Sequence, residues 1–311
     1  MAYYSATKLN DSDGDGLIKL TSAKGSYKKG STIRLCPNAP VIDPAKPYCY
    51  VGQNEACPVA VTPPPPPPPP EPDPEPVPVG IKTAIVNGEA FLQSDALTVG
   101  FNKAGGIGTL YAAPEGFRTD LATGLKRVGL YDGKRNDMIL QGRAVEGFGL
   151  LINGARKANM ALTGYSNIPG AFADALHWVG SDAVSVDQKV HLEGSKLRFT
   201  ITLTNRGSAA PDVTYFRSVD LDQSDLYATA NKVAAQGRWE CGLPGGGTVV
   251  LQTAHPKART AVTTYDKASY IGTARAVGQT KTADEVVQLV FALGAMAPGQ
   301  TETLSFELEV L

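Results

Sequence analysis

The sequence predicts an all-β protein with two folded parts joined by a proline-rich linker. Short apolar segments alternate with Gly, Pro, Ser and Lys along the chain, and the stretch VTPPPPPPPPEPDPEPVPVG interrupts them at 61–80. Within many segments apolar and polar residues alternate with a period of two, which is typical of half-buried strands. We therefore expect a small β-rich anchoring domain at 1–60, a linker at 61–80 and a large antiparallel β-sandwich at 81–311.

The first domain shows strand-like segments at 16–20 (GLIKL), 30–36 (GSTIRLC) and 47–52 (PYCYVG). A domain of about 60 residues buries little apolar surface, so disulfides, an ion or a partner chain are expected to stabilise it.

Four cysteines are the disulfide candidates: Cys36, Cys49, Cys57 and Cys241. The first three lie in the small domain, so one pairing there leaves a thiol over. That thiol could bond Cys241 or another subunit, and a buried free Cys241 is the alternative.

The linker cannot enter a helix or a sheet, because each proline fixes φ and lacks an amide donor. Polyproline II remains; at about 3.1 Å per residue, 63–78 would span roughly 50 Å. We interpret the segment as a spacer between the two domains. A hinge, or a proline-motif ligand for another protein, is the alternative.

The second domain carries strand signals up to residue 311. In SKLRFTITLTNRG (195–207), apolar residues alternate with Arg and Thr, which predicts an antiparallel strand with one buried face. Further strands are expected at 185–194, 284–294 and 300–311, a hairpin at 96–112, and short helices at 121–130 and 224–237.

Charge and hydropathy exclude two classes of partner. The net charge is −1, the pI is near 6.3 and no Lys/Arg cluster stands out, so nucleic acid is not an expected partner. No apolar run approaches about 18 residues, so membrane insertion is not expected.

No secretory signal is visible at the start, yet the cysteines are typical of an oxidising compartment. A phage protein released by lysis reconciles these facts, and a chain trimmed of its signal does so equally.

Two acidic groups are candidate cation sites. Asp11, Asp13 and Asp15 occupy positions 1, 3 and 5 of an EF-hand-like loop, although position 12 is Ser22. The motif predicts Ca²⁺ as the one candidate cofactor, and an Asp/Gly turn is the alternative.

The second group, in RSVDLDQSD, contains Arg217, Asp220, Asp222 and Asp225. It predicts either a cation or carbohydrate site or a structural ion pair between Arg217 and Asp220, of which the ion pair is favoured.

The aromatic side chains of Trp178 and Trp239 are candidate glycan contacts, with a place in the sandwich core as the alternative. No G-x-S-x-G nucleophile elbow and no phosphate-binding loop is present.

Four segments of the second domain resemble galactose-mutarotase-like β-supersandwiches. They are VEGFGLLING (145–154), the strand ending LTNRG, YFRSVDLDQSD (215–225) and FALGAMAPGQTETLSFELEV (291–310). The resemblance covers most of 81–311 and implies a supersandwich of the kind found in bacterial surface and tailed-phage proteins. Mutarotases of that superfamily use a His acid and a Glu base. None of His177, His191 and His255 matches that motif, so catalysis is not carried over.

The function predicted from the sequence is a non-enzymatic structural protein of a bacteriophage virion, such as a capsid decoration, neck, collar or fibre component. Its expected partners are other virion subunits, further copies of the chain and host surface glycans. A carbohydrate-binding module or adhesin of a bacterial surface is the alternative, and a carbohydrate-active enzyme is a third reading.

Overall fold

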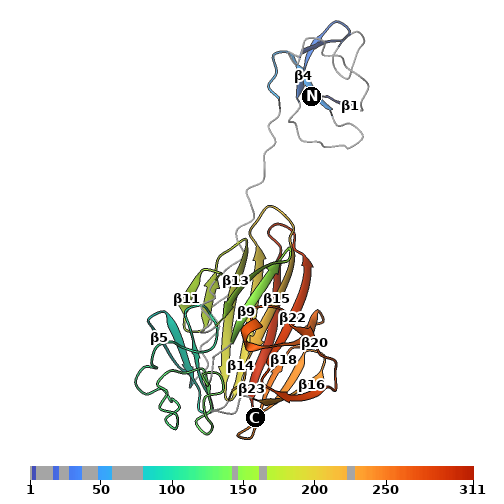
Figure 1. Cartoon of the computed structure of the whole chain (residues 1–311). Helices are drawn as coiled ribbons and strands as arrows, with labels where there is room; N and C mark the ends of the chain where they lie inside the picture. Colours follow the sequence, from blue (N-terminus) through green and yellow to red (C-terminus); the bar gives the residue numbers. More distant parts are fainter. Residues whose placement is uncertain are drawn as a thin grey trace. The chain divides into compact units, whose positions relative to one another are not determined.

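The computed structural model divides into two compact units, Met1–Glu75 and Pro76–Leu311 (Figure 1). The boundary between them falls inside the predicted linker, of which the structure describes only Gly80. The structure describes residues 2–4, 17–20, 28–36, 48–57, 80–141, 146–160, 167–222 and 228–311.

The first unit contains a four-stranded antiparallel sheet with the order β1-β4-β3-β2. Its strands are β1 (Ala2–Tyr4), β4 (Tyr48–Gly52), β3 (Thr32–Cys36) and β2 (Leu17–Lys19). The three predicted strands of this part are thereby confirmed. A disulfide joins Cys36 to Cys57, with 5.5 Å between their Cα atoms, so β3 is tied to the segment that follows β4.

The second unit is built from two large antiparallel sheets and one small one. The six-stranded sheet consists, in order, of β10 (Ala155–Met160), β9 (Glu146–Ile152), β15 (Asp212–Val219), β22 (Val286–Ala295), β19 (Ala258–Thr263) and β20 (Thr273–Ala274). The nine-stranded sheet consists of β11 (Gly170–Asp174), β12 (His177–Gly180), β13 (Val184–Glu193), β14 (Lys196–Asn205), β23 (Thr301–Val310), β18 (Thr248–Gln252), β17 (Arg238–Gly242), β16 (Thr229–Ala235) and β21 (Thr280–Ala283).

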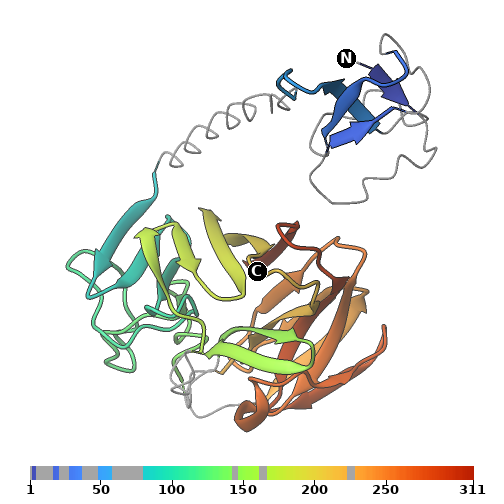
Figure 2. The ribbon, with the colours of Figure 1, turned by 90° about the horizontal axis from the view of Figure 1, so that it is seen from above.

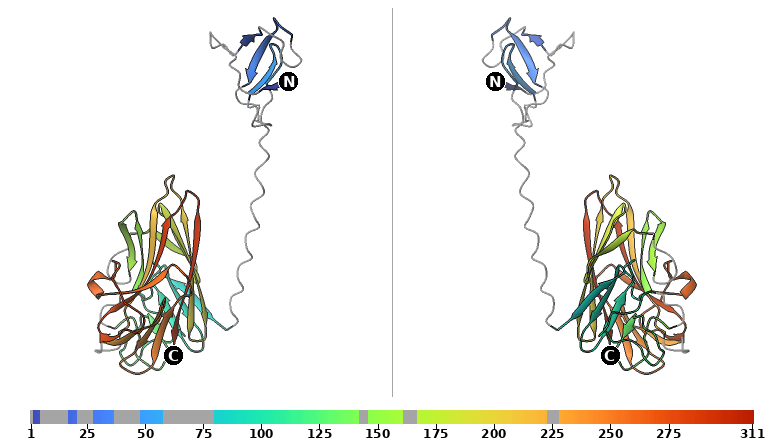
Figure 3. Two further views of the ribbon diagram at one scale, coloured as in Figure 1. Left: turned by 90° about the vertical axis from the view of Figure 1, so that its right-hand side faces the viewer. Right: turned by 90° about the vertical axis from the view of Figure 1, so that its left-hand side faces the viewer.

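The small sheet lies at one edge of the second unit, where β6 contacts β11 (Figure 2). Its order is β5 (Lys82–Val86), β6 (Glu89–Gln93), β7 (Thr98–Phe101) and β8 (Leu130–Tyr131). The long strands of the large sheets run side by side in Figure 3, and the last strand, β23, lies inside the nine-stranded sheet between β14 and β18. The all-β sandwich predicted from the sequence is therefore confirmed.

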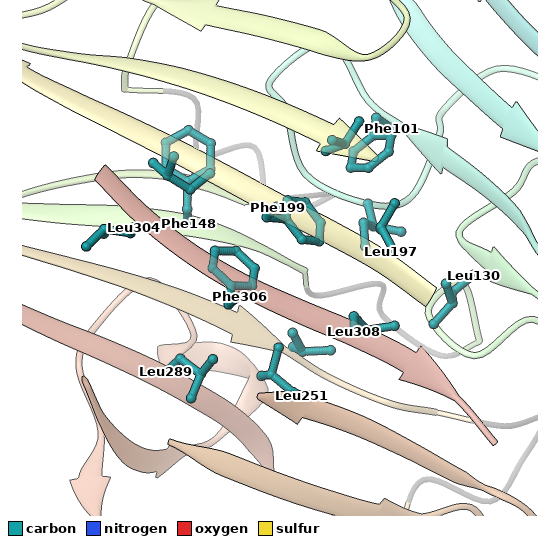
Figure 4. Packing of buried hydrophobic residues seen from close by; sticks show 14 of the residues in the cluster. Phe101, Leu130, Phe148, Leu197, Phe199, Leu251, Leu289, Leu304, Phe306 and Leu308 are labelled. Carbon is teal, nitrogen blue, oxygen red and sulfur yellow. The ribbon is translucent and has the colours of Figure 1, made fainter. Parts of the chain in front are cut away.

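The core lies between the two large sheets. Phe199 of β14 and Phe306 of β23 stack with their ring centres 4.7 Å apart (Figure 4), and both are almost fully buried. Leu289 of β22 belongs to the same apolar cluster from the opposite sheet. Burying one such side chain contributes about 1.5–3 kcal/mol. The period-two alternation of β14 thus places every second residue in this core and its neighbours on the opposite face.

A two-residue turn sets the register of β13 and β14. Glu193 pairs with Lys196, and Gly194 between them has a φ of 55°, a conformation that residues with a side chain adopt at a cost. The turn fixes a ten-residue ladder in which both strands present their apolar residues to the core.

Three local expectations are wrong. The segment 121–129 forms turns and bends, and Leu130 begins β8. The described part of 224–237 forms strand β16 and the turn after it. The one helical element of the described residues is a single 3-10 turn, Tyr265–Lys267. Only the first arm of the hairpin predicted at 96–112 is a strand, since beyond β7 the pairing is limited to a bridge between Phe101 and Ile107. No helix in the described ranges is long and apolar enough to cross a membrane.

Candidate functional site

A row of polar side chains crosses four neighbouring strands of the nine-stranded sheet. Arg198 (β14) pairs in register with Glu307 (β23), Glu307 with Gln252 (β18), and Gln252 with Arg238 (β17). All four lie on the face turned away from the core, because the residues on either side of Arg198 and Glu307 belong to the core cluster. We call this surface the outer face.

The four side chains hold one another in position. Arg198 Nε donates to Glu307 Oε1 at 2.9 Å, Gln252 Nε2 donates to Glu307 Oε2 at 3.2 Å, and Arg238 Nη1 donates to Gln252 Oε1. Burial opposes ionisation of Glu307, but hydrogen bonds from Arg198 and Gln252 and the charge of Lys196 lower its pKa below the usual range. The row is therefore a fixed array of charged and amide groups.

A depression of about 480 Å³ lies over this row. It is lined by Arg198, Ala235, Gln236, Arg238, Gln252, Thr253, Ala254, Ser305, Phe306 and Glu307. Its two arginines are balanced by Glu307 and by Glu240, whose Oε1 lies 3.1 Å from Arg238. A site with paired positive and negative groups is suited to a neutral ligand with many hydroxyls, because hydroxyls both donate and accept hydrogen bonds.

A second depression, of about 490 Å³, lies on the outer face near the other end of the same strands. Its lining includes Ser185, Asp187, Thr202, Thr204 and Thr301. These five side chains are short and polar, and Thr204 and Thr301 share a hydrogen bond of 3.0 Å between their hydroxyls.

Hydroxyl side chains connect the two depressions. Cross-strand pairs between β14 and β23 run from the Arg198–Glu307 pair through Thr200–Ser305 and Thr202–Thr303 to Thr204–Thr301. Six residues of strand separate the first pair from the last, which corresponds to about 20 Å. The outer face therefore offers one continuous polar track along two strands.

The ion pair predicted between Arg217 and Asp220 is wrong. Arg217 Nε donates instead to Glu146 Oε1 of β9, and both side chains are completely buried. Arg217 Nη1 donates to Gln188 of β13 at 2.8 Å, and its guanidinium lies 4.5 Å from the Phe199 ring centre. Glu146 begins strand β9 and lies diagonally across from Arg217 on the adjacent strand β15, inside the sandwich.

Asp220 belongs to an acidic cluster with Asp222 and Asp284. One carboxylate oxygen of each lies within 4.8 Å of the others. Burial and the charges of Asp222 and Asp284 raise the pKa of Asp220 to about 8, and burial and Asp284 raise the pKa of Asp222 to about 7. The sequence grouped Asp220 with Asp222, but Asp284 joins them from beyond β21. Asp225 lies outside the described residues, as do Asp11, Asp13 and Asp15.

Both tryptophans are fully buried, so their predicted role as glycan contacts is wrong. Trp178 Nε1 donates to the carbonyl of Lys103 at 3.0 Å, and Trp239 Nε1 donates to the carbonyl of Gln288 at 3.0 Å. A Cβ on Gly180 would approach the Trp178 ring to 2.5 Å, which shows how tightly the indole is enclosed. These rings are core residues with satisfied polar atoms.

The remaining candidates are structural. Cys241 is a buried free thiol, and burial, with the nearby charge of Glu240, raises its pKa to about 12. His177 contacts Asp187 at 2.9 Å, His191 pairs in register with Arg198, and the ring of His255 packs against Phe291 with 5.6 Å between centres. The side chain of Cys49 lies outside the description.

The comparisons with known proteins identify no family: no family model and no curated protein matches the sequence. Solved structures that are similar include a polysaccharide lyase, at 9% identity and a TM-score of 0.33, covering 74% of this chain and 32% of that chain. Another is a putative aldose 1-epimerase from Escherichia coli K12, at 12% identity and a TM-score of 0.36, covering 74% of this chain and 98% of that chain. The matched part spans about a third of the lyase.

The polar row on the outer face was missed by the sequence reading. Each member sits in a separate strand, and only the register brings Arg198, Glu307 and Gln252 together. The available signal was the set of polar residues that alternate with the core residues in β14 and β23.

Proposed function

We propose that this chain is a non-enzymatic interaction protein whose second unit binds glycans on its outer face. The observation that carries the proposal is the row Arg198–Glu307–Gln252–Arg238, which forms the floor of an open depression. Its side chains are fixed by mutual hydrogen bonds before any ligand arrives, so binding would cost little side-chain entropy. The threonine track extends the same surface and suits a chain of several sugar units over a single monosaccharide.

The state of Glu307 favours binding over catalysis. A general acid or base works best with a pKa near the operating pH. Arg198 and Gln252 occupy both oxygens of Glu307 and lower its pKa, so this carboxylate is a fixed hydrogen-bond acceptor and a poor proton carrier. Glycan attachment fits both settings predicted from the sequence, a bacterial surface and a phage virion. In the virion setting, the proposed partners of the chain are other virion subunits and further copies of itself.

A glycan array probed with the full-length protein tests the proposal. Wild type is expected to bind a restricted set of neutral oligosaccharides, and Arg238→Ala should weaken that binding at least tenfold. Arg259→Ala is the matched control, since Arg259 is an exposed arginine on β19 of the other large sheet. Absence of binding by folded wild type, or equal losses in both variants, would contradict a glycan site on the outer face.

A further inference from the structure

The acidic cluster at the end of β15 lacks a counter-charge. Asp220 and Asp222 follow that strand and are 3% and 4% exposed, while Asp284, between β21 and β22, is exposed. Across the described parts of the chain, no Lys, Arg or His forms an ion pair with any of the three. The positive groups nearest in sequence are Arg217, three residues before Asp220, and Lys281, three residues before Asp284. They are bound to Glu146 and Glu285, respectively.

A separate observation is an orphaned oxygen within the cluster. Oδ1 of Asp222 is shielded from solvent and accepts no hydrogen bond from any described residue. A buried carboxylate oxygen without a donor is costly, because it has lost water and gained nothing in exchange. The cost disappears if a cation or a proton occupies the space between the carboxylates.

We propose that Asp220, Asp222 and Asp284 bind a hard divalent cation, with Ca²⁺ as the best fit. Carboxylate oxygens are the ligands that Ca²⁺ prefers, and ligands each 2.3–2.6 Å from one ion lie at most about 5 Å apart. The spacing of the three oxygens, within 4.8 Å, falls inside that limit. The exposed Asp284 leaves a route by which the ion and its remaining water ligands enter. The site is independent of glycan binding on the outer face.

Such an ion would connect two distant parts of the sequence. Asp220 and Asp222 extend from the six-stranded sheet, and Asp284 follows β21 at the edge of the nine-stranded sheet. Asp284 also precedes β22, the neighbour of β15 in the six-stranded sheet, where Val219 pairs with Val287. The ion would therefore fix the connection from β21 to β22 against the end of β15, and its removal should lower the stability of the second unit.

Thermal unfolding of the full-length protein, followed by tryptophan fluorescence, tests the site. Both tryptophans of the chain lie in the second unit, so the signal reports that unit alone. After treatment with a chelator, Ca²⁺ at about 100 times its dissociation constant should raise the Tm by roughly 5–10 °C. Mg²⁺ and Mn²⁺ are compared in parallel.

Four variants localise the effect. Asp284→Asn should abolish the Ca²⁺-dependent shift, and because Asp284 is exposed this variant is expected to fold; Asp222→Asn should do the same. Asp212→Asn, an exposed aspartate at the other end of β15, should keep the full shift. A variant with Asn at 11, 13 and 15 should also keep it, which separates this cluster from the predicted loop in the first domain.

Two results would overturn the proposal. If none of the three cations shifts the Tm while Asp284→Asn is more stable than wild type in chelator, the carboxylates share a proton instead of an ion. If Asp284→Asn retains the Ca²⁺ shift, the ion binds elsewhere on the chain.

Discussion

Arg217 and Glu146 form an ion pair between the adjacent strands β15 and β9, with both side chains completely buried. Glu146 Oε2 also accepts a hydrogen bond from the backbone amide of Ile107. Arg217 Nη1 donates to Gln188 Oε1, and Gln188 Nε2 in turn donates to the carbonyl of Gly105 at 2.9 Å. The network thus links both large sheets to the loop after β7. Nη2 of Arg217 has no hydrogen-bond partner among the described residues, so the network is not fully satisfied.

Breaking this pair should be strongly destabilising. Glu146→Ala leaves a buried guanidinium without its counter-ion, and we expect a loss of about 3–5 kcal/mol in the free energy of unfolding. The double variant Glu146→Gln, Arg217→Met removes both charges and should recover part of that loss. Urea unfolding followed by tryptophan fluorescence measures both. A double variant as unstable as Glu146→Ala would show that the charges themselves are not the cause.

Removing the disulfide should affect the first unit only. Replacing Cys36 and Cys57 by Ser opens a loop with a sequence separation of 21, and loops of this size contribute about 3 kcal/mol. We expect faster proteolysis within residues 1–57 and an unchanged tryptophan-monitored Tm of the second unit. A lowered Tm of the second unit would contradict the division into two separately stabilised units.

The enclosure of Trp178 predicts a large structural effect on replacement. Trp178→Ala should lower the free energy of unfolding by about 3–5 kcal/mol, because it leaves a cavity in the core. The Lys103 carbonyl would also lose its indole donor. Chemical denaturation followed by circular dichroism measures the effect, since the variant loses part of the fluorescence signal. A loss below about 1 kcal/mol would mean that the indole is less tightly packed than the structure shows.

The lowered pKa of Glu307 predicts the direction in which its contribution to stability changes as the pH falls. The unfolded chain binds a proton near the ordinary glutamate pKa of about 4.3, while the folded chain does so only at lower pH. The contribution of Glu307 to stability is therefore complete above that range and is lost as pH falls through the folded pKa. The stability difference between wild type and Glu307→Gln should be constant from pH 8 to about 5 and shrink below about pH 4. Glu193→Gln, exposed at the end of β13, controls for removal of a carboxylate. A difference that grows in acid would have the wrong sign.

Much of the fold could be predicted from the sequence, because one-sided burial leaves a period-two pattern. The strand 195–207 and the terminal pair of strands were expected within a few residues of β14, β22 and β23. The helix expected at 224–237 was wrong where the structure describes it, because tertiary pairing of β16 with β17 and β21 outweighs the helix-forming Ala and Lys residues.

The contacts between polar side chains were less predictable than the strands, since they depend on long-range register. Nothing local in the sequence indicates that Arg217 faces Glu146, 71 residues away, or that Asp284 joins Asp220. The tryptophans were ambiguous for a similar reason, because burial of a Trp is decided by residues such as Gly180 that lie elsewhere in the sheet.

Mapping the binding surface by amide hydrogen exchange tests the central claim most directly. The full-length protein is compared with and without the oligosaccharide that binds best on the array. Protection is predicted in β14, β23, β18 and β17, centred on Arg198, Glu307 and Gln252, and Arg238→Ala should abolish it. Protection confined to the first unit or to the six-stranded sheet, with none on the outer face, would contradict the account.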